Sequence, residues 1–139
     1  MLDITGYFLP ASTGPQGVIP SGQTVTGNFG TTVDLTTGGT FVNYSITLPA
    51  SAPVALTTAN INFAASLANV TDGDATCTGT AAAPTAPAGK VCMYIYGQNN
   101  VTLAAGFAAL DLPTQAFYVS WTAGMGEGHI FLTWAYTAP

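Results

Sequence analysis

The sequence has almost no basic side chains: Lys90 is the only one, and arginine is absent. Binding to nucleic-acid phosphates or to anionic membranes requires several Lys or Arg side chains. With a formal net charge of −5, the chain is therefore not expected to bind either. Charged residues of both signs make up only 5 % of the sequence, against a usual share of about 25 %. The surface must be built from Thr, Ser, Asn, Gln and Gly, which suits a protein packed into an assembly or held outside a cell.

Long apolar runs are also missing. No stretch approaches the ~20 residues that a membrane-spanning helix needs, although hydrophobic residues make up 48 % of the chain. The opening MLDITGYFLP lacks the basic start and unbroken apolar stretch of a signal peptide, so we expect none in this sequence. The length of 139 residues suits one domain with a single core.

Alternation of apolar and polar residues dominates the chain instead. In 40-TFVNYSITLP-49, Val42, Tyr44 and Ile46 fall on one face and polar residues on the other, which is typical of a half-buried strand. Turn-forming Gly, Pro, Asn and Asp separate the similar segments, which are residues 23–29, 59–65, 90–97, 115–123, 128–137 and, more weakly, 2–9. The pattern predicts an all-β, antiparallel sandwich over residues 23–139, with seven or eight short strands and a jelly-roll arrangement.

One segment also fits a helix. Leu56, Phe63, Leu67 and Val70 have helical spacing. The Thr and Asn residues between them are poor helix formers, so we predict a strand that ends near Ala65.

Cys77 and Cys92 are the only cysteines, and His129 is the only histidine. A structural zinc site needs four thiolate or imidazole ligands, so the chain has too few. A thioredoxin-like site separates its thiols by two residues, whereas these cysteines lie fifteen positions apart. The stretch between them is poor in apolar side chains, and a disulfide there would remove roughly 3 kcal/mol of unfolded-chain entropy. We predict a Cys77–Cys92 disulfide; two unpaired buried thiols are the alternative.

Side chains suited to catalysis or metal binding are few. Glu127 and His129 share one face of a predicted strand, where a base and its orienting group could meet. No nucleophile motif accompanies them, so we expect no enzyme activity and no cofactor. Asp72 and Asp74, with Asn69 nearby, resemble half a calcium loop. A full site needs about six to eight oxygen ligands, and we predict a turn without metal.

Aromatic side chains are the best candidates for contact with a ligand. Tyr94 and Tyr96 lie in one predicted strand, and Trp121 and Trp134 lie in the last two. Exposed rings of this kind stack on sugars or fill a partner's pocket. Tryptophans at strand spacing more often belong to the core, whereas both interpretations stay open for the tyrosines. The candidate contacts are Tyr94, Tyr96 and Trp121, with a glycan as the candidate ligand.

Several stretches resemble an uncharacterised β domain at the carboxyl end of secreted or surface proteins, many from actinobacteria. The stretch 77-CTGTAAAPTAPAGKVCMY-94 is similar to its Cys-x-Gly-Thr, Pro-Thr-Ala and Cys-x-Tyr pattern. Its opening resembles 20-PSGQTVTGNFG-30 and its ending resembles 133-TWAYTAP-139. Before it, 3-DITGYF-8 is similar to the closing strand of repeats that often precede that domain. The chain departs from the pattern over residues 64–75. The resemblance implies an exported β domain without catalytic residues.

Residues 1–22 are predicted to be an amino-terminal strand and linker. Ile4 and Phe8 lie in a short apolar segment, and the Pro- and Gly-rich stretch 10–22 that follows is typical of a linker. Such a segment can add as an assembly arm to a neighbouring subunit, with Ile4 and Phe8 as the specific contacts. The alternative is that it forms the first strand of its own sandwich.

These features together predict a non-enzymatic structural or attachment module at an extracellular or virion surface. The expected type is a homo-oligomeric virion decoration protein or fibre head, whose partners are its own copies and a larger assembly. The sheet edges have almost none of the charged residues that block pairing between strands of different copies. Self-association is therefore expected, and the expected oligomer is a trimer. The alternative function is a glycan- or surface-binding terminal domain of a secreted bacterial protein.

Overall fold

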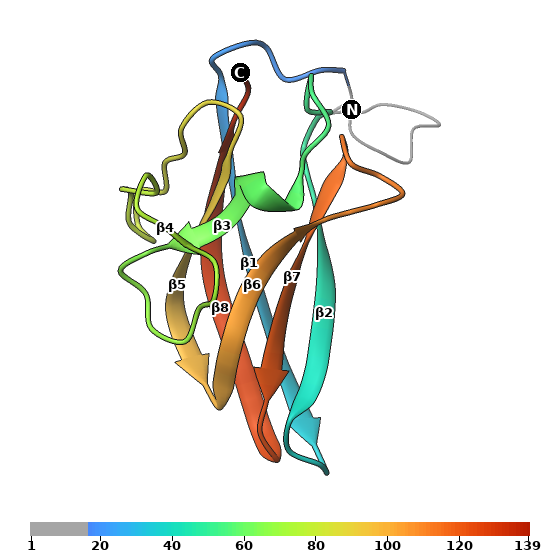
Figure 1. Ribbon diagram of the computed structural model, residues 1–139, viewed down its shortest axis with the longest axis vertical. Helices are drawn as coiled ribbons and strands as arrows, with labels where there is room; N and C mark the ends of the chain where they lie inside the picture. The colour runs from blue at the N-terminus through green and yellow to red at the C-terminus, as the bar shows by residue number, and fades with distance from the viewer. Residues whose placement is uncertain (1–16) are drawn as a thin grey trace, which may run out of the picture.

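The computed structural model describes residues 17–139, so the predicted contacts of Ile4 and Phe8 lie outside the described residues. The chain forms a sandwich of two β-sheets, with strand orders β1-β8-β5-β3-β4 and β2-β7-β6 (Figure 1). The elements are β1 (Thr24–Leu35), β2 (Thr40–Thr47), the 3-10 turn η1 (Thr58–Asn60), β3 (Ile61–Ala64), β4 (Gly73–Asp74), β5 (Val91–Asn99), β6 (Val101–Ala108), β7 (Ala116–Ala123) and β8 (Gly126–Thr137). Over residues 17–139, no helix is long and apolar enough to cross a membrane.

The strand pairing confirms most of the antiparallel prediction. β1 pairs with β8 and β2 with β7, and these two pairs continue into β5 and β6, all antiparallel. β3 differs, because it pairs parallel with both β5 and β4. Parallel neighbours need a long crossover connection, which residues 65–90 supply between β3 and β5. In sequence, the paired strands β2 and β7 lie between the paired strands β1 and β8. This order is compatible with a jelly roll, which stays a prediction.

Within residues 17–139 the predicted strands form, and two strands, β4 and β6, were missed; the weakly predicted strand 2–9 lies outside the described residues. The segment around residues 59–65 is a strand, β3, rather than a helix. β6 follows β5 through Asn100, whose φ of 57° suits the short polar side chain of a tight turn. Within β6, the register shifts between Thr102 and Ala105, and Leu103 has a φ of 55°. Such a bulge breaks the alternation of apolar and polar residues on which the strand prediction depends.

The facing sides of the two sheets form one hydrophobic core. Phe63 from β3, Phe117 from β7 and Leu132 from β8 are fully buried there. The Phe117 and Trp134 rings meet edge to face, with centroids 5.4 Å apart. Alternate residues of β7 and β8 point into this core, as the sequence pattern predicted.

The described end of the predicted linker belongs to the sandwich. Ile19 is only 2 % exposed and is part of the core. Its N–H donates to the Ser51 carbonyl at 2.8 Å, and the Gly22 N–H donates to the Ala138 carbonyl at 2.8 Å. Residues 17–22 are therefore not a free linker, although regular strand structure begins at Thr24, close to the predicted start at residue 23.

Candidate functional site

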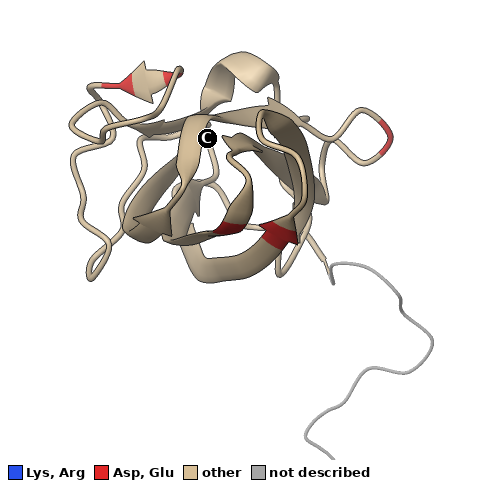
Figure 2. Ribbon diagram, turned by 90° about the horizontal axis from the view of Figure 1, so that it is seen from below, with Lys and Arg blue, Asp and Glu red and all other residues tan. Residues whose placement is uncertain are grey.

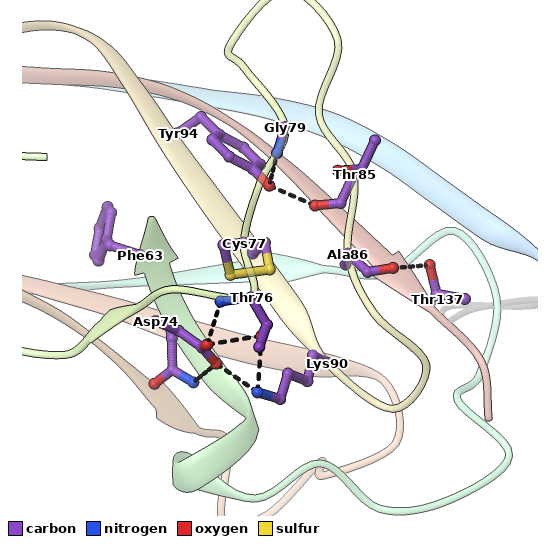
Figure 3. Close-up of a disulfide and its surroundings, with 12 residues drawn as sticks. Phe63, Asp74, Thr76, Cys77, Gly79, Thr85, Ala86, Lys90, Tyr94 and Thr137 are labelled. Atoms are coloured by element: carbon purple, nitrogen blue, oxygen red, sulfur yellow. Dashed lines mark hydrogen bonds and ion pairs between the residues drawn. A yellow bond between two sulfur atoms is a disulfide. The ribbon is translucent and has the colours of Figure 1, made fainter. Parts of the chain in front are cut away.

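A disulfide between Cys77 and Cys92 closes the long connection before β5 and confirms the sequence prediction (Figure 3). Cys92 lies in β5 and is fully buried, and Cys77 lies in the loop after β4. Ala64 and Tyr94 pack against the two cysteines as a small separate cluster. The bond therefore fastens the loop over the outer face of the five-stranded sheet.

Asp74 joins the two ends of the disulfide loop. Its carboxylate accepts hydrogen bonds from the Lys90 ammonium at 2.6 Å and from the Thr76 hydroxyl at 2.7 Å (Figure 3). These two hydrogen bonds, the one from Lys90 first, hold the pKa of the Asp74 carboxyl well below its usual range. Asn62 of β3 donates to the same carboxylate at 3.2 Å. Asp74 thus connects both ends of the loop to the sheet.

The two predicted calcium carboxylates have different protein partners. Asp74 is paired with Lys90, whose ammonium lies where a cation would have to bind. Asp72 accepts a hydrogen bond from the Gly106 N–H at 2.6 Å, and burial raises the pKa of its carboxyl. Over residues 17–139, no three His, Cys, Asp or Glu side chains come together as a group that could hold a metal ion.

The Asp74–Lys90 pair gives the fold a predicted dependence on pH. Because folding lowers the pKa of Asp74, its stabilisation is present above about pH 4 and is lost as the pH falls further. An Asp74→Asn variant is expected to lose about 1 kcal/mol of unfolding free energy at pH 7, and the difference from wild type should shrink below pH 4. Urea unfolding at pH 7 and pH 3 measures this. Asp34→Asn, on the exposed face of β1, is the matched control and should change little; equal stability of wild type and Asp74→Asn at pH 7 would contradict the prediction.

Two of the three predicted ligand contacts are buried. Tyr94 is only 3 % exposed, because the disulfide loop covers it. Its hydroxyl donates to the Thr85 carbonyl at 2.6 Å and accepts from the Gly79 N–H at 3.0 Å (Figure 3). Trp121 lies fully in the core, where its indole N–H has no acceptor among the described residues. Neither side chain offers a surface to a ligand, so Tyr94 anchors the loop and Trp121 is a core residue.

Tyr96, the third predicted contact, is 60 % exposed. The register of β5 and β8 shifts between Ile95 and Gly97, so Tyr96 is the extra residue of a β-bulge. Its ring is nearly parallel to that of Phe131 on β8, with centroids 6.2 Å apart. The ring of His129 is nearly parallel to Phe131 on the same strand, at 4.9 Å. We call these three residues, Tyr96, Phe131 and His129, the aromatic row.

Two glycines make room for the central ring of the aromatic row. A Cβ at Gly30 of β1 would lie 2.5 Å from the Phe131 ring, and a Cβ at Gly97 of β5 would lie 3.0 Å from it. Both glycines are the register partners of Phe131 on the two neighbouring strands. The ring can therefore occupy the space that side chains on these strands would fill.

A hollow of about 230 Å³ adjoins the row beside Tyr96. It is lined by Leu67 and Ala68 of the loop after β3, and by Ile95, Tyr96, Gly97 and Gln98 of β5. Among the residues that the structure describes, no charged side chain lines it. Tyr96 thus separates an uncharged hollow on one side from a second aromatic ring on the other.

The outer face of the three-stranded sheet carries the other candidate surface. A groove of about 320 Å³ runs over it, lined by Phe41, Asn43, Thr58, Phe107, Ala108, Leu110, Tyr118 and Ser120. Phe41 is 62 % exposed and Leu110 is 86 % exposed. Ser120 donates a hydrogen bond to Asn43 at 2.8 Å, so this polar pair in the groove is already satisfied. We call these lining residues the groove face.

Searches of family models, curated proteins and solved structures gave no match to this chain in any of the three. The resemblance to the carboxyl-terminal domain of surface proteins therefore stays a prediction. Sequence reasoning found Tyr96 but missed Phe131 and the groove face. Phe131 follows His129 by two residues in the segment 128–137, so the alternation itself places both on the outer face of that strand.

Proposed function

We propose that the protein is a non-enzymatic structural and attachment module that self-associates on the exterior of a larger assembly. The observation that carries this proposal is the groove face: exposed aromatic and aliphatic side chains line it, and within residues 17–139 no charged side chain does. Interface cores in proteins are enriched in aromatic residues and depleted of charge, and unpartnered apolar patches usually mark contact sites. A second copy is the occupant that we propose for this face.

The scarcity of charge elsewhere supports an assembly rather than a freely diffusing protein. Acidic residues are few and scattered around the molecule (Figure 2). The nearest one in sequence to the groove face is Asp111, which follows Leu110 but does not line the groove. The free edges of β1 and β2, twelve and eight residues long, carry only Asp34 as a charged side chain. Repulsion between copies is therefore weak.

Location outside the cell is part of the same proposal. The Cys77–Cys92 disulfide is the feature that supports it, because structural disulfides persist mainly in oxidising surroundings. A virion decoration protein or a fibre head, assembled as a trimer, is the specific form that we propose. The alternative, a glycan- or surface-binding terminal domain of a secreted bacterial protein, is favoured by the aromatic row, of which Tyr96 is exposed and Phe131 and His129 are partly buried.

Self-association is expected to depend on the groove face. Sedimentation velocity at tens of micromolar should give about three times the monomer mass of 14.1 kDa. A Leu110→Asp variant should weaken association at least about tenfold, because it places a charge in an apolar contact, while its exposed position leaves the fold intact. Met125→Asp is the matched control, since Met125 is 71 % exposed but lies in the turn at the other end of β7.

Two outcomes would contradict this proposal. A wild-type protein that sediments as a monomer at these concentrations would remove self-association. An equal effect of the Leu110→Asp and Met125→Asp variants would remove the groove face as its site. Deleting residues 1–16 separates the groove face from the predicted arm of Ile4 and Phe8, because that deletion keeps the core residue Ile19. Loss of association in the deletion alone would favour the arm.

A further inference from the structure

We propose that the aromatic row and the adjoining hollow bind a neutral glycan. This site lies on the five-stranded sheet, whereas the groove face lies on the three-stranded sheet, so the proposal goes beyond self-association. Tyr96 is its central residue, because it contacts Phe131 on one side and lines the hollow on the other.

A β-bulge in β5 determines the position of Tyr96. The β-bulge at residues 95–97 adds one residue opposite Phe131, and the extra residue is the tyrosine. Bulges re-aim side chains and are found next to functional sites. The neighbouring Tyr94 of the same strand is covered by the disulfide loop, which ends before it reaches Tyr96. The loop therefore leaves this part of the sheet uncovered.

The size and chemistry of the site fit a sugar. Aromatic rings present an apolar surface with a small polar handle, which matches the apolar C–H faces and the hydroxyl groups of a pyranose. The hollow of about 230 Å³ is large enough for one such ring, between Tyr96 and the loop residues Leu67 and Ala68. The amide of Gln98 lines the same hollow and can both donate to and accept from hydroxyl groups.

The absence of charge in the lining selects against anionic sugars. An acidic glycan would need a basic side chain, and Lys90, the only one in the sequence, is already paired with Asp74. Glu127, the register neighbour of Asp34, lies on the same strand as His129 and would repel an anion. The expected ligand is thus a neutral hexose or N-acetylhexosamine chain.

Isothermal titration with two neutral hexasaccharides, cellohexaose and chitohexaose, tests the proposal. We expect at least one to bind with a dissociation constant near or below ~1 mM. Tyr96→Ala and Phe131→Ala should each weaken binding at least about tenfold, whereas Tyr96→Phe keeps the ring and should retain most of the affinity. Val54→Ala is the matched control, because Val54 is 60 % exposed, like Tyr96, but lines neither the hollow nor the groove face.

Each remaining outcome counts against the glycan site. Absence of binding by both hexasaccharides at millimolar concentration overturns it. Equal losses of affinity in Tyr96→Ala and Val54→Ala would show non-specific contact with exposed apolar side chains. A Tyr96→Ala variant that dissociates into monomers, in the sedimentation experiment, would show that a second copy covers the row instead. Sedimentation of the Leu110→Asp variant tests self-association without involving the glycan site. The glycan site and self-association can therefore fail independently.

Discussion

Replacing both cysteines, in a Cys77→Ala, Cys92→Ala variant, is expected to lower the free energy of unfolding by about 3 kcal/mol. For a chain of this length the loss corresponds to a fall of roughly 10 °C in the melting temperature. The bond closes a loop of 15 residues, and the unfolded chain gains conformational freedom when it is absent. Thermal unfolding of the wild type and the variant under the same conditions measures the effect.

Apart from the disulfide, the loop has few apolar contacts to hold it in place. Between the two cysteines, only Ala81 and Ala86 pack against the small cluster around Tyr94. The remaining ties are polar. They include the Tyr94 and Asp74 contacts described above and two further hydrogen bonds, from Thr133 to the Ala81 carbonyl at 2.8 Å and from Thr137 to the Ala86 carbonyl at 2.7 Å. Each such bond contributes only about 1 kcal/mol net, so the loop should open locally in the variant before the sandwich unfolds.

Trypsin reports that local opening. Lys90 is the only Lys or Arg of the chain and lies inside the loop, so cleavage there yields two fragments. The variant should be cut much faster than the wild type at a temperature where both sandwiches are folded. Oxidised wild-type protein, if cut, should stay one covalent species on a non-reducing gel. A reducing agent should sensitise the wild type and leave the variant unchanged. Equal melting temperatures for the two proteins would show that the sheet alone holds the loop.

Most of the sandwich could be predicted because its strands are half-buried. A strand with one face in the core and one in solvent alternates apolar and polar residues, as β2 does between Thr40 and Thr47. The paired ends of β5 and β8 that are buried on both faces, residues 91–94 and 134–137, were also recognised, since most of their side chains are apolar or aromatic. The parallel pairing of β3 could not be predicted, because it depends on where the chain returns after residues 65–90.

The candidate sites could be predicted only in part. Tyr94 and Tyr96 are two residues apart on one strand, so local sequence gives them the same face. What separates them is the disulfide loop, which covers Tyr94 and leaves Tyr96 exposed. The covering segment is distant in sequence, and no local pattern shows how far it reaches. The groove face was missed for a related reason. It includes Phe107 of β6, and the sequence pattern did not predict β6 because its bulge breaks the alternation of apolar and polar residues.

The two sheets offer different outer surfaces. The three-stranded sheet presents a groove of about 320 Å³ that a second copy could fill. The five-stranded sheet is covered at one end by the disulfide loop and presents the aromatic row at the other. An assembly through one sheet would therefore leave the other free to contact a ligand. This arrangement is what an attachment module requires, since repeated weak sites in one oligomer strengthen binding through avidity.

The second large effect on stability is expected in β6, a strand that the sequence pattern did not predict. Gly106 lies in its second half, opposite Val119 of β7, and packs against Ile61 and Met93 of the other sheet. A Cβ at this position would lie 2.5 Å from the backbone oxygen of Ile61 and 2.7 Å from the end of the Met93 side chain. The Gly106 N–H also donates to the Asp72 carboxylate at 2.6 Å, so the strand cannot shift away without losing that bond.

A Gly106→Ala variant is therefore expected to lose about 2 to 3 kcal/mol of unfolding free energy, because the backbone of Ile61 in β3 cannot move aside as a flexible side chain could. Gly128→Ala in β8 is the matched control: its Cβ would meet its nearest atoms at 3.4 to 3.6 Å, an ordinary contact, and stability should change by less than about 1 kcal/mol. Urea unfolding of both variants measures the difference. If Gly106→Ala were as stable as the control, the two sheets would not approach each other at Gly106 as closely as this packing requires.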